Sequence, residues 1–284
     1  MPAGELLVAQ ISDPHVGSGL ASGGEDNLGR LDRVIERLSG MSRQPDILLV
    51  TGDLADQEAE APYRLLQNRL ERCPFPAYVC LGNRDARRLA RRVFGPEDSG
   101  FFQYVVEAGP LRLIVLDTLE EGRHGGAFCE ARASWLRERL AEAPDRPTMI
   151  ALHHPPIDSN IAWVTTSPAE PWVGRLDSVL AGQRQVVALV TGHIHRPIAA
   201  SRNGIPVLVC PSVAAPVTLD LAPLDPEVPD GREFVADGPP GFALHLWRDG
   251  TLTSHVDFVQ EQPVLARFDA LMQPTILARF AERP

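Results

Sequence analysis

The chain has 284 residues, a formal net charge of -10 at pH 7 and a hydrophobic fraction of 44%. This length accommodates one large α/β domain or two smaller ones with a sizeable core. The acidic charge argues against a sequence-independent binder of nucleic-acid polymers, because such binding rests on a basic surface. The four cysteines show no CxxC spacing, so neither a structural zinc site nor a disulfide framework is indicated.

The sequence contains no targeting or membrane-spanning pattern. Residues 1–10 lack the basic start and long apolar run of a secretion signal, and no stretch approaches the ~18 apolar residues of a membrane span. We therefore expect a soluble, cytoplasmic protein.

Short apolar runs alternate with amphipathic segments along the chain, as in α/β proteins. Residues 6–11 and 47–50 are continuous apolar runs, which predict strands buried on both faces. Between them, residues 27–40 place four apolar side chains on one face and predict a helix. Further strands are predicted over residues 77–81, 101–107, 111–117, 148–152, 186–190, 206–210, 242–247 and 252–258, and further helices over residues 58–72, 130–141 and part of 263–283.

Five of the predicted strands end in residues that can bind metals or phosphates. Open α/β sheets bind their ligands at the carboxyl ends of the strands, often next to a glycine that lets the backbone turn. Residues two apart on extended backbone also point the same way, which would aim the Asp13 and His15 pair at one point. The side chains at these ends are Asp13, His15, Asp53, Asn83, His153, His193 and His195.

These side chains offer oxygen and imidazole ligands without thiolates, a set that suits Mn, Fe, Co or Zn ions. Seven ligands are too many for one ion. Two ions ~3.5 to 4 Å apart, bridged by a carboxylate, would use them and could clamp the oxygens of a phosphoryl transfer. One histidine or asparagine alone is more often structural, but the coincidence at five strand ends favours a metal centre.

The order and spacing of these motifs resemble the calcineurin-like metallophosphoesterases, and most of all their bacterial class III cyclic nucleotide phosphodiesterase and glycerophosphodiesterase branch. The motifs are Asp13-Pro14-His15, Gly52-Asp53, Gly82-Asn83-Arg84-Asp85, His153-His154-Pro155-Pro156 and Gly192-His193-Ile194-His195.

The resemblance implies a four-layer α/β/β/α sandwich with a dinuclear centre that hydrolyses a small anionic phosphodiester by attack of a metal-bound hydroxide. It implies that one ion is held by Asp13, His15 and His195 and the other by Asn83, His153 and His193. Asp53 would bridge the two ions. Some members of the superfamily have lost ligands and serve as scaffolds, but all seven positions are filled here, which favours an enzyme.

Arg84 stands where the branch usually has a histidine. A guanidinium stays charged, so it can stabilise negative charge and orient oxygens but cannot act as a general acid. We therefore predict a substrate-binding and catalytic role for Arg84, and His154 is a second catalytic candidate. In the competing interpretation Arg84 is a surface residue that faces away from the metals, and His154 or solvent supplies the proton. The same motif resembles the UDP-diacylglucosamine pyrophosphohydrolases, so a pyrophosphate hydrolase is the alternative function.

The remaining segments complete the predicted organisation. A catalytic domain is expected over residues 1–260, with a loop-rich rim near residues 157–182 and a surface excursion near 214–241. Trp163 and Trp172 in the rim would either contact substrate or pack in the core. A C-terminal extension over 261–284 could dock on a second subunit, which leaves a homodimer open. Four arginines, Arg87, Arg88, Arg91 and Arg92, form either a solvated helix face or an attraction for anions.

Overall fold

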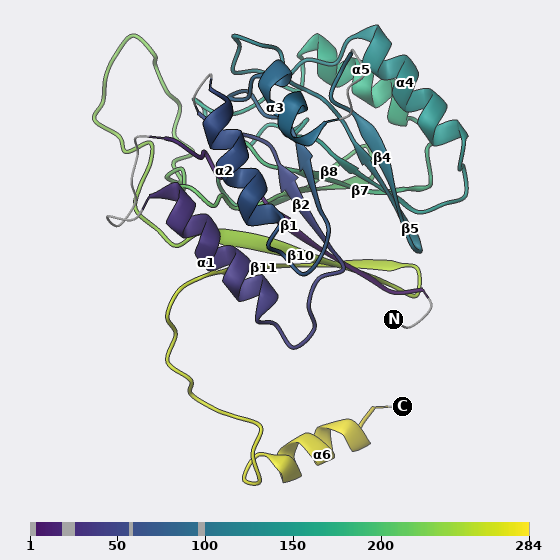
Figure 1. The fold of residues 1–284 in the computed structure, drawn as a ribbon, viewed down its shortest axis with the longest axis vertical. Coiled ribbons are helices and arrows are strands. Elements are labelled where there is room, and N and C mark those ends of the chain that lie inside the picture. The colour runs from purple at the N-terminus through teal and green to yellow at the C-terminus, as the bar shows by residue number, and fades with distance from the viewer. Residues whose placement is uncertain (1–3, 19–25, 57–58, 96–99, 284) are drawn as a thin grey trace.

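Two mixed β-sheets form the centre of the protein, and helices cover the outer face of each (Figure 1). The computed structural model describes residues 4–18, 26–56, 59–95 and 100–283. The first sheet has the order β11-β10-β1-β2-β3 and the second the order β4-β5-β6-β7-β9-β8. Both combine parallel and antiparallel neighbours.

The strand bounds agree closely with the predicted runs. The first sheet consists of β1 (Leu6–Ile11), β2 (Ile47–Thr51), β3 (Ala77–Cys80), β10 (Gly241–Arg248) and β11 (Thr251–Phe258). The second consists of β4 (Tyr104–Ala108), β5 (Leu111–Val115), β6 (Thr148–Ala151), β7 (Val186–Thr191), β8 (Ile198–Arg202) and β9 (Ile205–Val209). Of the strands formed by the described residues, only β8 has no counterpart among the predicted strands.

The helices divide between the two outer faces. The first sheet is covered by α1 (Asn27–Ser39), α2 (Glu60–Leu70) and α3 (Arg87–Phe94), and the second by α4 (Glu130–Ala141) and α5 (Pro171–Leu180). In α1 the predicted apolar face is buried, and Asp26 caps the helix by accepting from the Gly29 N–H at 2.7 Å. The predicted start of α2 at position 58 lies outside the described residues.

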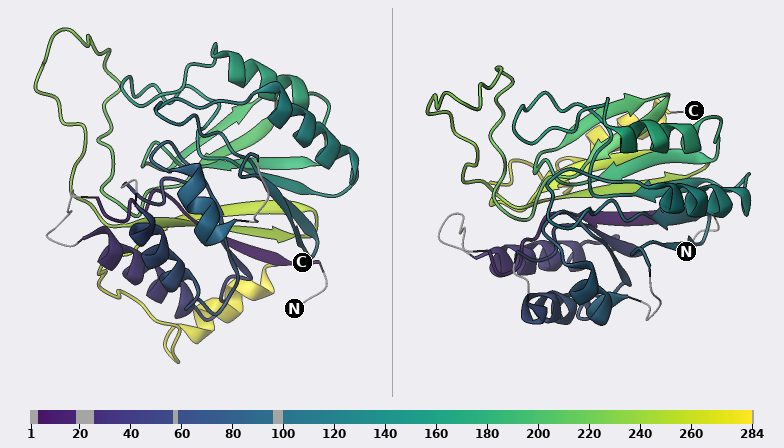
Figure 2. Two further views of the ribbon diagram at one scale, coloured as in Figure 1. Left: turned by 45° about the horizontal axis from the view of Figure 1, so that its top comes forward. Right: turned by 90° about the horizontal axis from the view of Figure 1, so that it is seen from above.

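Three separate apolar layers hold these elements together. One lies between α1, α2, α3 and the first sheet, one between α4, α5 and the second sheet, and one between the sheets. Figure 2 shows the resulting order of helices, sheet, sheet and helices. The predicted four-layer α/β/β/α sandwich is confirmed.

The rim is less irregular than predicted, because its second half is helix α5. Pro171 stands in the first turn, where its missing N–H costs no hydrogen bond. Trp172, Val173, Leu176 and Val179 form the buried face at helical spacing. The irregular part of the rim therefore ends before residue 171.

The excursion and the C-terminal segment lie outside the layers. Residues 218–240 form a largely exposed loop at the left of Figure 1, joined at its base by the Val217 and Val235 bridge. No residue of α6 (Gln273–Ala281) is buried, and the helix stands apart at the end of an extended segment. Among the described residues, no helix has the length and apolar character needed to cross a membrane.

Candidate active site

The predicted ligands stand on unusual backbone at the strand ends. Asp13, His15, Asp53, His193 and His195 all have positive φ, between 43° and 72°. Residues other than glycine rarely adopt this left-handed conformation, and they hold it where the surrounding structure demands it, often at functional sites. The extended backbone on which the spacing argument for the Asp13 and His15 pair rested was therefore wrong, although the two side chains do converge.

A first group of ligand atoms gathers around Asp13, which is fully buried. Its Oδ1 lies 3.3 Å from Nε2 of His195 and 4.0 Å from Nε2 of His15. The two imidazole Nε2 atoms are themselves 3.1 Å apart. These three side chains come from the ends of β1 and β7, so the two sheets meet at this point, and the group has the composition of a metal site.

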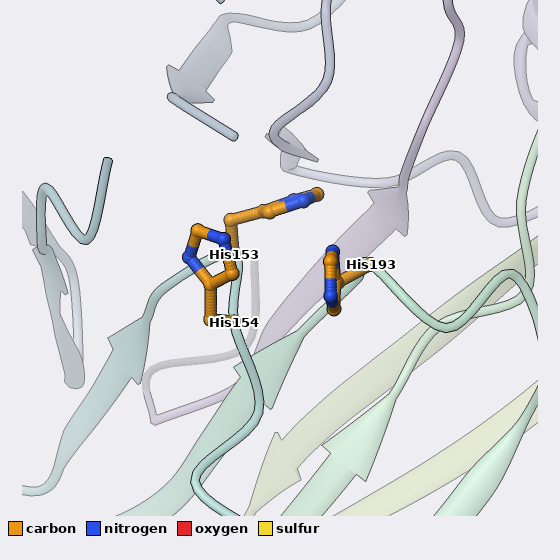
Figure 3. Close-up of side chains that lie close together, drawn as sticks. All are labelled: His153, His154 and His193. Atoms are coloured by element: carbon orange, nitrogen blue, oxygen red, sulfur yellow. The ribbon is translucent and has the colours of Figure 1, made fainter. Parts of the chain in front are cut away.

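A second group lies beside it and comes from the ends of β2, β3, β6 and β7. The Nε2 atom of His153 is 3.5 Å from Oδ1 of Asp53 and 3.2 Å from Oδ1 of Asn83. The ring centroids of His153 and His193 are 5.1 Å apart, and Figure 3 shows how close these two rings lie. All seven predicted ligands are therefore brought together.

Glycines make this approach possible. A Cβ on Gly52 would collide with the His153 ring, and one on Gly82 with the Asp53 carboxylate. Gly52 also has φ 91°, a conformation that glycine adopts without strain. The glycines before Asp53 and Asn83 thus give space, and Gly52 also provides a turn.

Three histidines are oriented by hydrogen bonds from their Nδ1 atoms. His153 donates to the Thr51 carbonyl at 2.8 Å, His195 to the Ala215 carbonyl at 2.9 Å, and His15 to the Asp56 carboxylate at 2.6 Å. These bonds orient each ring with its Nε2 facing the site, as in metal-binding histidines. The donor set fits metal ions. Sequence reasoning missed Asp56, whose only signal is a carboxylate three residues after Asp53.

Asp85 holds the turns that carry two of the ligands. Its carboxylate accepts the N–H groups of Leu54, Ala55 and Gly82 and the Tyr63 hydroxyl, at 2.8 to 3.2 Å. Asp85 is buried, and these bonds fix the backbone just after Asp53 and just before Asn83. The sequence placed Asp85 in a motif but assigned it no such role.

Charge interactions in the metal-free site follow from this packing. Burial lowers the pKa of His193 to about 3, assisted by neighbouring histidines, so this ring is neutral and able to bind a metal. For Asp13, burial opposes ionisation, but the neighbouring histidines, His195 above all, hold its pKa below the usual value. For His15, burial is outweighed by Asp56, Asp53 and Asp13, which raise its pKa to about 9.

His154 lies behind the ligands. Its ring is fully buried, with Nδ1 2.8 Å from the Thr118 hydroxyl and Nε2 donating to the His124 carbonyl at 3.1 Å. Burial, together with His153 and His193, lowers its pKa well below 6.5. His154 thus connects the ligand loop to the loop around His124.

A cavity of about 430 Å³ opens above the ligands. His15, Asn83, His193 and His195 form part of its lining, together with Arg84. The exposed Trp163 lines one side and stacks on Phe234 with ring centroids 4.7 Å apart, which joins the rim to the surface excursion. Trp172, in contrast, packs in the core, and its indole donates to Glu170 at 2.8 Å. The two tryptophans thus have different positions.

The basic segment is helix α3, and most of its arginines have protein partners. Arg87 pairs with Asp117 at 2.6 Å, Arg92 lies 3.7 Å from Glu60, and Arg91 donates to the Gly100 carbonyl. The interpretation as a solvated helix face with local ion pairs accounts for these contacts.

Binding of a metal ion should release a proton from His15. Because its pKa is raised to about 9, His15 is protonated at neutral pH in the metal-free protein, whereas a metal needs the free Nε2. The apparent affinity should rise ~10-fold per pH unit between about pH 7 and 9. The proton also stabilises the metal-free fold below pH 6.5, and this contribution is lost as the pH rises through 9.

Calorimetric titration of the metal-free protein with Mn²⁺ in buffers of different ionisation enthalpy counts the released protons. We expect about one proton near pH 7.5, and fewer in Asp56→Asn, which removes a carboxylate that raises the His15 pKa. Metal binding without proton release would contradict the prediction.

Comparison with known proteins agrees with the motifs. The model of the calcineurin-like phosphoesterase family matches residues 6–197. A probable glycerophosphodiester phosphodiesterase, GpdQ, of Arcobacter nitrofigilis is 31% identical over 262 residues, which cover 89% of this chain and 93% of that protein. A probable cyclic nucleotide phosphodiesterase of Rhodopseudomonas palustris is 32% identical over 275 residues, which cover 92% and 96%.

Solved structures show the same fold. The crystal structure of a dimetal phosphatase from Danio rerio matches with a TM-score of 0.63 and 14% identity, and the match covers 90% of this chain and 97% of that one. The resemblance expected from the five motifs is confirmed by the family match and by the similar phosphodiesterases. The chain belongs to the calcineurin-like phosphoesterase family and is a hydrolase.

Proposed function

We propose that the protein hydrolyses a small anionic phosphodiester, of the cyclic nucleotide or glycerophosphodiester type, with two transition-metal ions. The observation that carries this proposal is the convergence of seven oxygen and imidazole ligands, four of which line one cavity. The names of the similar proteins from Arcobacter nitrofigilis and Rhodopseudomonas palustris support this substrate class.

One ion would be held by Asp13, His15 and His195, and the other by Asn83, His153 and His193. Asp53 would bridge them. Its position supports this role, because Oδ2 lies 3.6 Å from Nε2 of His15 while Oδ1 lies 3.5 Å from Nε2 of His153. When bound, two such ions supply a nucleophile at neutral pH and neutralise charge on the phosphoryl oxygens. Mn, Fe, Zn and Co all suit these ligands.

The other polar groups of the cavity bind and orient the substrate. Arg84 is exposed at the cavity wall, and its guanidinium helps to lower the pKa of Asp56 against the effect of burial and alongside His15. Arg84 and His15 line the same cavity, where the guanidinium would bind a phosphoryl oxygen. Both nitrogens of His154 are engaged with Thr118 and His124, which favours positioning of that loop over proton transfer.

The position of Arg84 supports a second candidate. A pyrophosphate hydrolase of the UDP-diacylglucosamine type needs little acid catalysis, because its leaving group is a phosphate monoester. The cavity-lining arginine provides charge stabilisation without a proton, as this alternative requires. A cytoplasmic location, a homodimer and the exclusion of nucleic-acid polymers stay predictions.

A substrate panel tests the proposal. The Mn²⁺-loaded enzyme should hydrolyse cyclic nucleotides or glycerophosphodiesters with a higher kcat/KM than nucleotide-sugar pyrophosphates. The variant His193→Ala, which removes one of the seven ligands, serves as the inactive control. A preference for pyrophosphates would select the alternative, and turnover that survives both chelation and His193→Ala would reject a metal-dependent hydrolase.

A further inference from the structure

A buried glutamine joins the two sheets directly beneath the ligands. Gln10 in β1 is fully buried, and its side-chain amide donates to the Thr51 hydroxyl at 2.8 Å and to the Thr191 carbonyl at 2.9 Å. Thr51 ends β2 in the first sheet and Thr191 ends β7 in the second. One amide thus connects the ends of two strands that belong to different sheets.

A histidine fixes the orientation of this amide. His245 in β10 is buried, and its Nε2 donates to the Gln10 carbonyl oxygen at 2.9 Å. Its Nδ1 accepts from the Ser254 hydroxyl at 2.8 Å. Burial lowers the pKa of His245 to about 4, so the ring is neutral and carries one N–H, in agreement with these roles. The amide protons of Gln10 must then face Thr51 and Thr191.

Each strand end held by Gln10 leads directly to metal-binding residues. Thr51 precedes Gly52 and Asp53, and its carbonyl accepts from Nδ1 of His153 at 2.8 Å. The Thr51 hydroxyl also donates to Ser12, the neighbour of Asp13, at 2.9 Å. Thr191 precedes Gly192 and His193. A shift between the sheets would therefore separate ligands that must act on the same pair of ions.

We propose that Gln10 is a positioning residue that sets the distance between the ligands from the first sheet and the ligands from the second sheet. His245 supports Gln10 by fixing the orientation of its amide. This inference rests on the proposed two-ion centre. Neither residue lines the active-site cavity. Mutation of residues that hydrogen-bond to metal ligands typically lowers metal affinity by ~10- to 100-fold, and this range sets the scale of the expected effect.

The test uses Gln10→Met, which keeps the length of the side chain and removes all its hydrogen bonds. Wild-type protein loaded with Mn²⁺ should give the electron paramagnetic resonance spectrum of an exchange-coupled pair. In Gln10→Met the coupling should weaken, isolated Mn²⁺ should appear, and the affinity for the second ion should fall ~10-fold or more. His245→Phe, which leaves the amide free to turn, should show the same change to a smaller extent.

Gln185→Met is the matched control, because Gln185 is also a buried glutamine but stands before β7, at the opposite end of that strand from Thr191. It should lower the melting temperature without altering the Mn²⁺ spectrum. If Gln10→Met and His245→Phe also leave the coupling and second-ion affinity at wild-type values, the inference is wrong. If Gln10→Met does not fold, His245→Phe alone tests the inference, and an unchanged Mn²⁺ spectrum in that variant shows that it is wrong. A wild-type protein that binds fewer than two Mn²⁺ ions overturns the proposed function, and the inference with it.

Discussion

Asp53→Asn should lower kcat by ~10²-fold or more while the fold stays intact, since it would disturb both metal ions at once. Asparagine keeps the size of the side chain and retains an oxygen that can accept the Arg84 N–H, now bonded to Oδ1 at 2.8 Å. The change replaces the second oxygen, 3.6 Å from Nε2 of His15, by an amide NH2 group, whose nitrogen has no free lone pair for a metal.

Metal content gives a second readout for this variant. We expect wild type to bind two Mn²⁺ ions per chain and Asp53→Asn to retain fewer after gel filtration. A substitution that removes a ligand of only one ion, such as His195→Ala, should weaken binding of the other ion less than Asp53→Asn does. Elemental analysis of both proteins measures the stoichiometry directly.

Asp46→Asn is a suitable control for Asp53→Asn. Asp46 also has a largely buried carboxylate, which accepts the Leu7 N–H at 2.8 Å at the start of β2, the opposite end of the strand from the site. This variant should affect stability and leave kcat unchanged. If Asp53→Asn is as active as wild type and binds two ions, Asp53 does not bridge them.

The strands and their polar ends could be predicted because both signals are local. An apolar run that stops at a ligand predicts the end of a parallel strand, and β1, β2, β3, β6 and β7 all follow this pattern, with a glycine before the ligand in β2, β3 and β7. Parallel neighbours then place the strand ends of each sheet at one edge, whereas the meeting of the two edges depends on how the sheets pack. The four-layer order came from the family resemblance, which the three core layers match.

Other features depend on partners that are distant in sequence. The bond between Asp56 and His15 spans 41 residues, and the bond between Gln10 and His245 spans 235. Gln10 lies within an apolar run and shows no local pattern that would distinguish it. The left-handed backbone of the ligands arises from the crowding of several strand ends and has no signal in residue spacing. Helix α5 was missed for a different reason, because the Pro, Ser and Thr residues before it obscured the periodicity of its buried face.

Arg84 is exposed on the cavity wall, which supports the substrate-binding and catalytic role predicted for it. Its backbone N–H is bonded to Asp53, so the residue is held close to the proposed bridge while its side chain is free to reach a substrate. A guanidinium provides charge but no proton. The reaction rate should therefore depend on how well the leaving oxygen carries negative charge, and aryl diesters and pyrophosphates should react faster than alkyl diesters of similar shape.

Arg84→Ala should reduce kcat/KM by an amount equivalent to about 2 to 4 kcal/mol, the scale of removing one charge-stabilising group from a site that excludes water. Arg84→His should narrow the gap between aryl and alkyl diesters, because an imidazolium can protonate the leaving oxygen. Arg88→Ala removes the same charge from the exposed face of helix α3, outside the active-site cavity. This variant should have little effect on kcat/KM. Steady-state kinetics on diesters of graded leaving-group pKa measures all three variants. A kcat/KM that is independent of leaving-group pKa and unchanged in Arg84→Ala would show that Arg84 has no catalytic role.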